Sequence, residues 1–298
     1  MPAGPLHTRV RSGDVSIAVR EHTPPGPGRP TVVLVHGYPD RQDTWDALVA
    51  RLPLDRWHVV TYDVRGAGGS DAPAARAAYR TERLVDDLVA VVDAVADGAA
   101  FHLVGHDWGS VQLWDAVVAE ATDPRLRGRI ASFTSLSGPS LDQTTLVMRH
   151  PQGRRLAVLR QMLRSTYVVL FCLPVVPVLA WRCGHRLLGR LVATREGLPR
   201  DHWGPGLGAD AVHGLELYRA NVRRRLRSPR TVHTDVPVLV VHPARDRFLT
   251  AVLTEDLEQI CSDVRLEVVD AGHWLAVTHP GPVARLVSDH VQRHSGDH

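Results

Sequence analysis

The sequence contains no lysine and only three cysteines in 298 residues. Every cationic side chain other than histidine is therefore an arginine, which we attribute to genome composition. Cys172, Cys183 and Cys261 lie far apart without the paired spacing of a zinc site, and they leave one odd thiol. Neither a disulfide framework nor a metal site is predicted, and reduced thiols are typical of a cytoplasmic protein.

The chain also lacks a strong excess of charge, because its formal net charge is only +3. The one dense basic run, at residues 223–230, has no interleaved aromatic residues and is predicted to be a solvated helix face. We therefore expect no nucleic-acid partner.

Long apolar runs are absent as well. The longest uncharged stretch, residues 166–181, is shorter than the ~20 residues of a bilayer-spanning helix, and two prolines interrupt it. The first 23 residues have no apolar core of signal-peptide length. No transmembrane segment is predicted. Peripheral contact of residues 166–181 with lipid is left open, as is the choice between a monomer and a homodimer.

What the chain does contain is an alternation of strand and helix patterns. Buried-strand patterns occupy residues 31–35, 57–62, 101–104, 130–136, 236–241 and 265–269. A helical pattern follows Thr81, which we expect to be its N-cap. This alternation predicts an α/β fold, with a mostly parallel central sheet covered by helices on both faces. We expect a core of residues 1–138 and 232–298, and an inserted helical cap at residues 139–231.

The most informative motif is the sharp turn around Asp107. Gly105 and Gly109 lie two residues before and after it, between a strand pattern and a helical pattern. A nucleophile elbow needs this spacing, because its strained turn leaves no room for a Cβ on either flank. A carboxylate at a helix N-terminus is stabilised as an anion, so Asp107 is predicted to be a nucleophile toward an alkyl carbon.

An ester formed on Asp107 needs a base that activates water and an acid that orients the base. His273, directly after the last strand, is the best candidate for the base, and Asp246, after the preceding strand, is the best candidate for the acid. The order nucleophile, acid, histidine is that of α/β-hydrolases. The backbone N–H groups of Tyr38 and Trp108 are predicted to stabilise negative charge on the ester.

These motifs resemble the α/β-hydrolase superfamily, and within it the epoxide hydrolases. The turn His36-Gly37-Tyr38-Pro39 is similar to the oxyanion turn of that family, with His36 expected to be structural. Residues 63–70 are similar to its Asp-x-Arg-Gly-x-Gly-x-Ser loop, and residues 215–221 to its Tyr-Arg-Asn cap motif. The resemblance covers nearly the whole chain and is strongest to actinobacterial enzymes of a kind sometimes fused to a short-chain dehydrogenase.

The resemblance implies that Tyr218 and Tyr167 of the cap donate to the epoxide oxygen, since phenols with a pKa near ~10 stay protonated at neutral pH. Asp107 would then open an apolar or bulky epoxide to a vicinal diol through a covalent ester, without a cofactor or metal. One alternative is a haloalkane or haloacid dehalogenase with the same triad, although Tyr38 replaces its usual asparagine. Another is a non-catalytic ligand-binding protein of the same fold.

Overall fold

The computed structural model describes residues 5–295, and the strands within them form one eight-stranded sheet. In chain order they are β1 (Leu6–Ser12), β2 (Val15–Glu21), β3 (Thr31–Val35), β4 (His58–Tyr62), β5 (Phe101–His106), β6 (Ile130–Leu136), β7 (Val238–Pro243) and β8 (Val264–Val269). Their order in the sheet is β1-β2-β4-β3-β5-β6-β7-β8. β2 is antiparallel to both of its neighbours, β1 and β4, and the strands β3 to β8 are parallel to one another. The predicted α/β fold with a mostly parallel sheet is confirmed. The outer ends of the predicted core segments, residues 1–4 and 296–298, lie outside the described residues.

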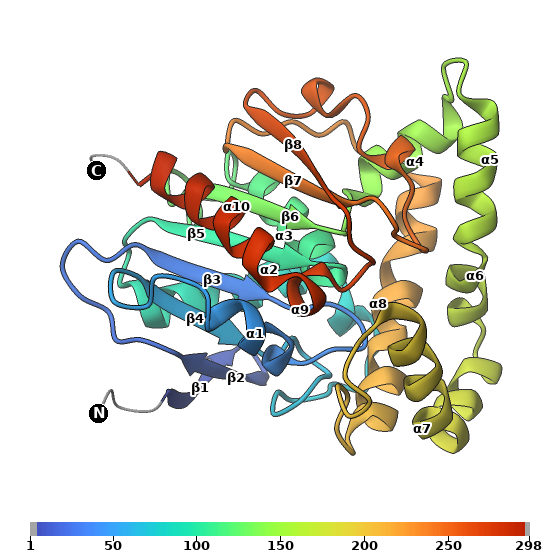
Figure 1. Cartoon of the computed structure of the whole chain (residues 1–298), viewed down its shortest axis with the longest axis horizontal. Coiled ribbons are helices and arrows are strands. Elements are labelled where there is room, and N and C mark those ends of the chain that lie inside the picture. Colours follow the sequence, from blue (N-terminus) through green and yellow to red (C-terminus); the bar gives the residue numbers. More distant parts are fainter. Residues whose placement is uncertain (1–4, 296–298) are drawn as a thin grey trace.

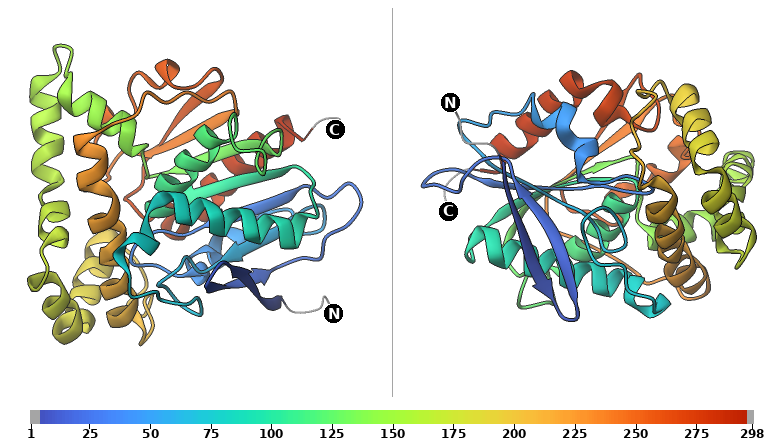
Figure 2. Two further views of the ribbon diagram at one scale, coloured as in Figure 1. Left: turned by 180° about the vertical axis from the view of Figure 1, so that it is seen from behind. Right: turned by 90° about the horizontal axis from the view of Figure 1, so that it is seen from below.

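Helices cover both faces of the sheet (Figures 1 and 2). α2 (Thr81–Ala96) and α3 (Trp108–Ala119) pack on one face, and their apolar residues share a buried cluster with the sheet. α1 (Asp46–Val49), α9 (Leu275–Thr278) and α10 (Pro280–Arg293) pack on the other face. Short 3-10 turns lie in the connections at Gln42–Trp45, Arg76–Tyr79, Ala251–Leu253 and Leu257–Gln259. Because the central strands are buried on both faces, they consist mainly of apolar residues.

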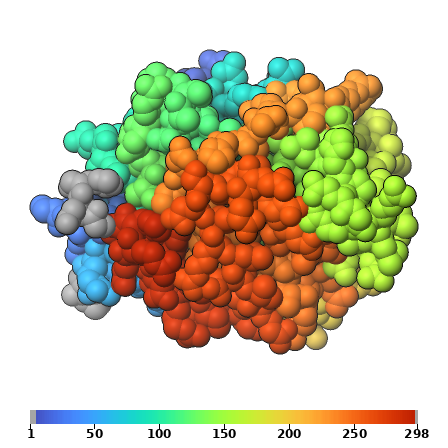
Figure 3. Space-filling view, turned by 90° about the horizontal axis from the view of Figure 1, so that it is seen from above, coloured from blue at the N-terminus to red at the C-terminus, as the bar shows by residue number. Residues whose placement is uncertain are grey.

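A block of helices lies between β6 and β7. It consists of α4 (Leu141–Arg149), α5 (Arg155–Arg164), α6 (Thr166–Cys172), α7 (Val176–Glu196) and α8 (Leu207–Arg227), and we call it the helical block. Figure 1 shows it beyond the carboxyl-terminal ends of the parallel strands, with α8 next to the core and with α5 and α6 outside α8. Figure 3, which shows the molecule from above, also places α5 at its outer edge. The block therefore covers the sheet edge at which ligand sites form in α/β proteins.

None of the helices within residues 5–295 is by itself long and apolar enough to cross a bilayer. Only α6 and α7 taken together reach the required length and composition, and they meet at an angle of 104°.

One element was not predicted, and one local expectation is wrong. The sequence pattern did not predict the hairpin β1–β2, because β1 is mostly exposed and carries charged side chains. The expected N-cap is wrong, since Arg80 occupies the N-cap position of α2 and Thr81 is its first helical residue. The Thr81 N–H donates to the Asn221 Oδ1 at 3.0 Å, so a side chain from α8 caps this helix.

Candidate active site

Asp107 lies at the turn between β5 and α3 with φ 50° and ψ −122°, a conformation that L residues rarely adopt. A Cβ on Gly105 would lie 2.6 Å from the Ser110 Cα, and a Cβ on Gly109 would lie 2.0 Å from the Val35 carbonyl oxygen. Only glycine fits on either flank, which is the physical reason for the Gly-x-Asp-x-Gly spacing.

Three loops bring Asp107, His273 and Asp246 together. The His273 Nε2 lies 3.5 Å from the Asp107 Oδ2, and the His273 Nδ1 lies 2.9 Å from the Asp246 Oδ2. The other Asp246 oxygen accepts the backbone N–H groups of Phe248 and Leu249 at 2.7 and 3.0 Å. The imidazole is held with one nitrogen toward the acid and the other toward the carboxylate at the elbow, which is the geometry that a base for ester hydrolysis requires.

The two carboxylates set the protonation of His273. Burial alone lowers the pKa of the imidazole, but the charges and hydrogen bonds of Asp246 and Asp107 outweigh it and raise that pKa to about 10. Burial also raises the pKa of Asp246, but the charge and hydrogen bond of His273 and the two backbone donors lower it overall. At neutral pH, His273 is therefore an imidazolium between two carboxylates.

The Asp107 Oδ1 accepts the backbone N–H of Tyr38 at 2.8 Å. Gly37 permits this approach, because a Cβ there would lie 2.5 Å from the Asp107 Cβ, and the Tyr38–Pro39 peptide bond is cis. The backbone N–H of Trp108, the second predicted donor, makes no hydrogen bond to this carboxylate within residues 5–295. The carboxylate is turned instead toward Tyr38 and His273, so the structure brings one of the two predicted donors into contact.

His36 supports this turn from the protein interior. Its Nδ1 lies 2.9 Å from the Gly37 carbonyl oxygen, and its Nε2 accepts the Val64 N–H at 2.9 Å. The predicted loop at residues 63–70 lies alongside, where the Asp63 carboxylate accepts the Gly69 N–H at 2.8 Å. Both ring nitrogens of His36 are occupied by the backbone, which leaves this residue a structural role.

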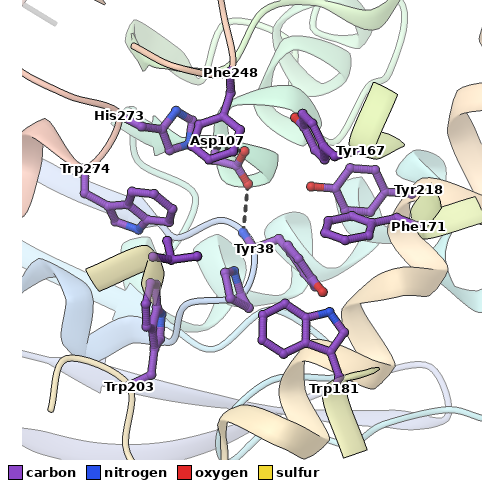
Figure 4. Close-up of a pocket in the computed structure, with 12 residues that line it drawn as sticks. Tyr38, Asp107, Tyr167, Phe171, Trp181, Trp203, Tyr218, Phe248, His273 and Trp274 are labelled. Atoms are coloured by element: carbon purple, nitrogen blue, oxygen red, sulfur yellow. Dashed lines mark hydrogen bonds and ion pairs between the residues drawn. The ribbon is translucent and has the colours of Figure 1, made fainter. Parts of the chain in front are cut away.

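Tyr167 of α6 and Tyr218 of α8 line the cavity opposite Asp107, and Figure 4 shows their hydroxyl groups directed toward it. Their ring centroids are 6.3 Å apart. Burial, and to a lesser degree the charge of Asp107, raises the pKa of both phenols well above the usual value. Both phenols therefore stay protonated and can donate hydrogen bonds. The hydroxyl of Tyr38 points away from Asp107, toward Trp181 (Figure 4).

The other residues of the predicted cap motif hold Tyr218 in place. Arg219 donates to the Phe171 carbonyl oxygen at 3.2 Å, near the C-terminus of α6. The Asn221 Nδ2 donates to the Tyr79 carbonyl oxygen at 2.8 Å, so α8 is tied to the core. These bonds position the two helices that carry the phenols relative to each other and to the sheet.

Two cavities meet at Asp107, Tyr167 and Tyr218. The smaller has a volume of about 80 Å³, and its aromatic wall consists of Tyr38, Phe171, Trp181, Trp203, Phe248 and Trp274. The larger, of about 410 Å³, extends between α3 and helices of the block, past Val111, Leu141, Met148, Met162, Val168 and Val222. Within the described residues, no His, Cys, Asp or Glu side chains form a group of three that could hold a metal ion.

The sequence did not predict a role for Asp40, which holds two tryptophans of the aromatic wall next to His273. The buried Asp40 carboxylate accepts the indole N–H groups of Trp203 and Trp274 at 2.6 and 2.8 Å, and lies 3.2 Å from the His202 Nε2. Burial alone raises the pKa of Asp40, but the hydrogen bond and charge of His202 are the main causes that lower it to about 2. Its one signal in the sequence is its place directly after the oxyanion turn.

Residues 30–280 match the family model described as the alpha/beta hydrolase fold, so the chain belongs to this family. Over 304 residues it is 32% identical to a Mycobacterium tuberculosis protein named "Probable oxidoreductase EphD", covering 97% of this chain and 50% of that protein. The chain thus spans about half the length of the curated EphD relatives that it matches. Epoxide hydrolase A of Mycobacterium tuberculosis is 40% identical over 115 residues, which are 39% of this chain and 34% of that protein.

Solved structures show the same fold. An epoxide hydrolase from Bacillus megaterium in complex with an inhibitor matches with a TM-score of 0.79 at 18% identity, over 96% of this chain and 100% of that chain.

Proposed function

We propose that this chain is an epoxide hydrolase, which opens an epoxide to a vicinal diol through a covalent ester on Asp107. The observation that carries the proposal is the pair of buried, protonated phenols of Tyr167 and Tyr218, which face the carboxylate across an apolar cavity. Epoxide opening needs a nucleophile at carbon and a donor at the departing oxygen together, and these groups provide both. The names of Epoxide hydrolase A and of the Bacillus megaterium enzyme support the same reaction.

In the first half of the reaction, the Asp107 Oδ2 bonds to an epoxide carbon while the ring carbon–oxygen bond breaks. Tyr167 and Tyr218 donate to the departing oxygen, and one of them transfers its proton to it. The imidazolium of His273 then replaces the proton on that phenol. The product of this half is a hydroxyalkyl ester of Asp107 and a neutral His273.

In the second half, the neutral His273 takes a proton from water while hydroxide adds to the Asp107 Cγ. The negative charge develops on the Oδ1, which faces the Tyr38 N–H. The Trp108 N–H, the first of α3, is proposed as the second donor to this charge. When the intermediate collapses, the leaving oxygen takes the proton of the added hydroxyl, and the diol, the Asp107 carboxylate and the imidazolium are restored.

This cycle uses the electrostatics of the site. Ester formation removes the charge of Asp107, one of the two carboxylates that raise the pKa of His273. The pKa of the imidazole then falls, because only Asp246 still stabilises the cation. The base is therefore released only after the ester has formed.

The cavities support a substrate class, because apolar side chains form most of their walls. We propose an apolar or bulky epoxide, with residues 139–231 acting as the cap that encloses it. The three free cysteines are in keeping with a cytoplasmic location.

The decisive experiment is capture of the ester. In His273→Gln, attack by Asp107 needs no base but hydrolysis does, so mixing with an aryl epoxide should add the mass of the substrate to the peptide that contains Asp107. His279→Gln is the matched control, because His279 contacts the neighbouring Thr278 rather than the triad. This control should turn over substrate without accumulating an adduct. An unmodified Asp107 peptide together with lost turnover in His273→Gln would contradict the proposal.

A further inference from the structure

The outer surface of the helical block exposes an extended apolar face. Of the sixteen large apolar side chains that are exposed in the described residues, twelve lie between residues 156 and 191. They include Leu159 and Leu163 on α5, Val169 on α6 and Leu187 on α7, which are 52%, 63%, 69% and 64% exposed. We call the surface formed by residues 155–195 the α5–α7 face. An apolar surface of this extent on one side of a molecule marks an interaction site.

The longer segment that contains this face is strongly cationic. Residues 143–195 contain nine arginines and no aspartate or glutamate, a formal charge of +9, whereas the rest of the chain has 26 arginines against 32 acidic residues, a formal charge of −6. Six of the nine are exposed and make no hydrogen bond or ion pair with the described residues, namely Arg155, Arg160, Arg182, Arg186, Arg190 and Arg195. The positive charges of these six arginines therefore have no partner within residues 5–295.

Apolar and cationic residues form adjoining stripes on α7. Leu179, Cys183 and Leu187 recur every four residues and are exposed. Arg182 and Arg186 follow the same spacing next to them. Residues four apart lie on one side of a helix, so the apolar stripe points outward with arginines along its edge. This pattern is typical of helices that lie in the plane of a membrane interface.

We propose that the α5–α7 face docks on the surface of an anionic lipid bilayer. The acyl region accepts the leucine side chains, and the lipid phosphates accept the unpaired arginines. A second copy of the same face is a poor partner, because its arginines would oppose those of the first copy without any carboxylate between them. α6 and α7 meet at an angle of 104° and α7 packs on α8, so the two helices do not form one straight span across the bilayer.

The position of the larger cavity fits this orientation. Met162 and Val169, which are 53% and 69% exposed on the face, also line the cavity that reaches Asp107. Docking would therefore bring the opening of the cavity to the lipid, from which an apolar epoxide could enter. This consequence rests on the proposed function, whereas docking itself does not.

The test is binding of the full chain to sonicated vesicles of phosphatidylcholine, with or without one third phosphatidylglycerol, at low ionic strength. We expect binding to the anionic vesicles only, weakened by added salt. Replacing Arg182, Arg186 and Arg190 together by glutamine should weaken binding about 100-fold, since each arginine near an anionic surface contributes about a 5-fold factor. The pair Leu159→Glu and Leu187→Glu should weaken it at least as much.

Matched controls carry the same changes on other surfaces. Replacing Arg51, Arg56 and Arg285 by glutamine removes three exposed arginines from the surface of the α/β part of the molecule. The pair Leu6→Glu and Val268→Glu replaces two exposed apolar residues of the sheet. Both controls should bind vesicles like the wild type. Far-UV circular dichroism and thermal unfolding establish that each variant is folded.

A fluorophore on Cys183, the one exposed cysteine of the described chain, gives a second reading. Its emission should shift to shorter wavelength with anionic vesicles and not with neutral ones.

Several results would overturn the proposal: no binding of the wild type to anionic vesicles, equal binding to neutral vesicles, or binding that the arginine variant leaves unchanged. A dimer in sedimentation velocity that the Leu159→Glu and Leu187→Glu pair dissociates would overturn it in favour of a protein interface. Vesicle binding is read without turnover, and epoxide turnover is read without vesicles, so failure of either proposal is seen separately.

Discussion

Removal of the Tyr218 or Tyr167 hydroxyl is the sharpest test of how the epoxide opens. The Tyr218 ring packs against Trp108, Phe171 and Tyr38, with centroids 4.9, 5.2 and 5.4 Å away. Phenylalanine retains these ring contacts and the volume of the side chain. A change in rate in Tyr218→Phe therefore reports the lost hydroxyl rather than a collapsed pocket.

The expected loss in the rate of ester formation follows from the burial of the site. A hydrogen bond to a developing alkoxide in a water-poor pocket lowers the barrier by about 1.4–4 kcal/mol, which is about 10-fold to 1000-fold in rate. Each single variant should slow ester formation by that factor. The double variant should be nearly inactive, because both phenols face the same region beside Asp107 (Figure 4).

The assay is rapid-quench measurement of ester formation with an aryl epoxide, followed by the decay of the ester. Decay should be close to wild type in each single variant, since hydrolysis uses His273 and the Tyr38 N–H. Tyr38→Phe is the comparison, because its hydroxyl points toward Trp181, and we expect a change below about 3-fold in ester formation. Wild-type ester formation in the double variant, or an equal loss in Tyr38→Phe, would refute the reasoning.

The other predictions concern the nucleophile, the base and the leaving group. Freshly prepared Asp107→Asn should form no diol, because an amide cannot attack the epoxide carbon, and full turnover measured by chromatography would exclude the covalent route. The folded pKa of His273, about 10, lies above its unfolded value of ~6.5, so the stability it contributes is fully present below pH ~6.5 and is lost as the pH rises through 10. The difference in the free energy of unfolding between wild type and His273→Gln, measured by urea titration, should therefore shrink from pH 6 to pH 10, and growth of that difference would contradict the assignment. Bromoalkanes should give negligible halide release, whereas fast release that survives the double tyrosine variant but not Trp108→Phe would favour a dehalogenase.

Much of the core was predictable because its signals are local. β3 and β6 have the predicted bounds, and the other parallel strands differ from prediction by at most two residues at either end, since buried parallel strands are short apolar runs. The cap of α2 was not predictable from neighbouring residues. Its donor is Thr81 and its acceptor, Asn221, comes from 140 positions further along the chain.

Some residues of the site could be predicted from the sequence, and others could not. Asp107, Asp246 and His273 could be proposed from the sequence because each follows a parallel strand, and parallel strands end at one edge of the sheet. Asp40 could not be assigned, since its partners Trp203 and Trp274 are 163 and 234 residues away. The aromatic wall has no periodicity either, because its members come from separate helices and loops.

The proposed chemistry also divides between the two parts of the chain. The groups for ester hydrolysis, which are His273, Asp246 and the Tyr38 N–H, all lie on loops of the α/β core. The donors for epoxide opening, Tyr167 and Tyr218, lie on helices of the block. A disturbance of the block should therefore slow ester formation and spare hydrolysis, as long as Asn221 still ties α8 to the core. His273 lies between the carboxylates of Asp107 and Asp246, so in the proposed cycle it becomes a base only after Tyr167 and Tyr218 have helped to form the ester.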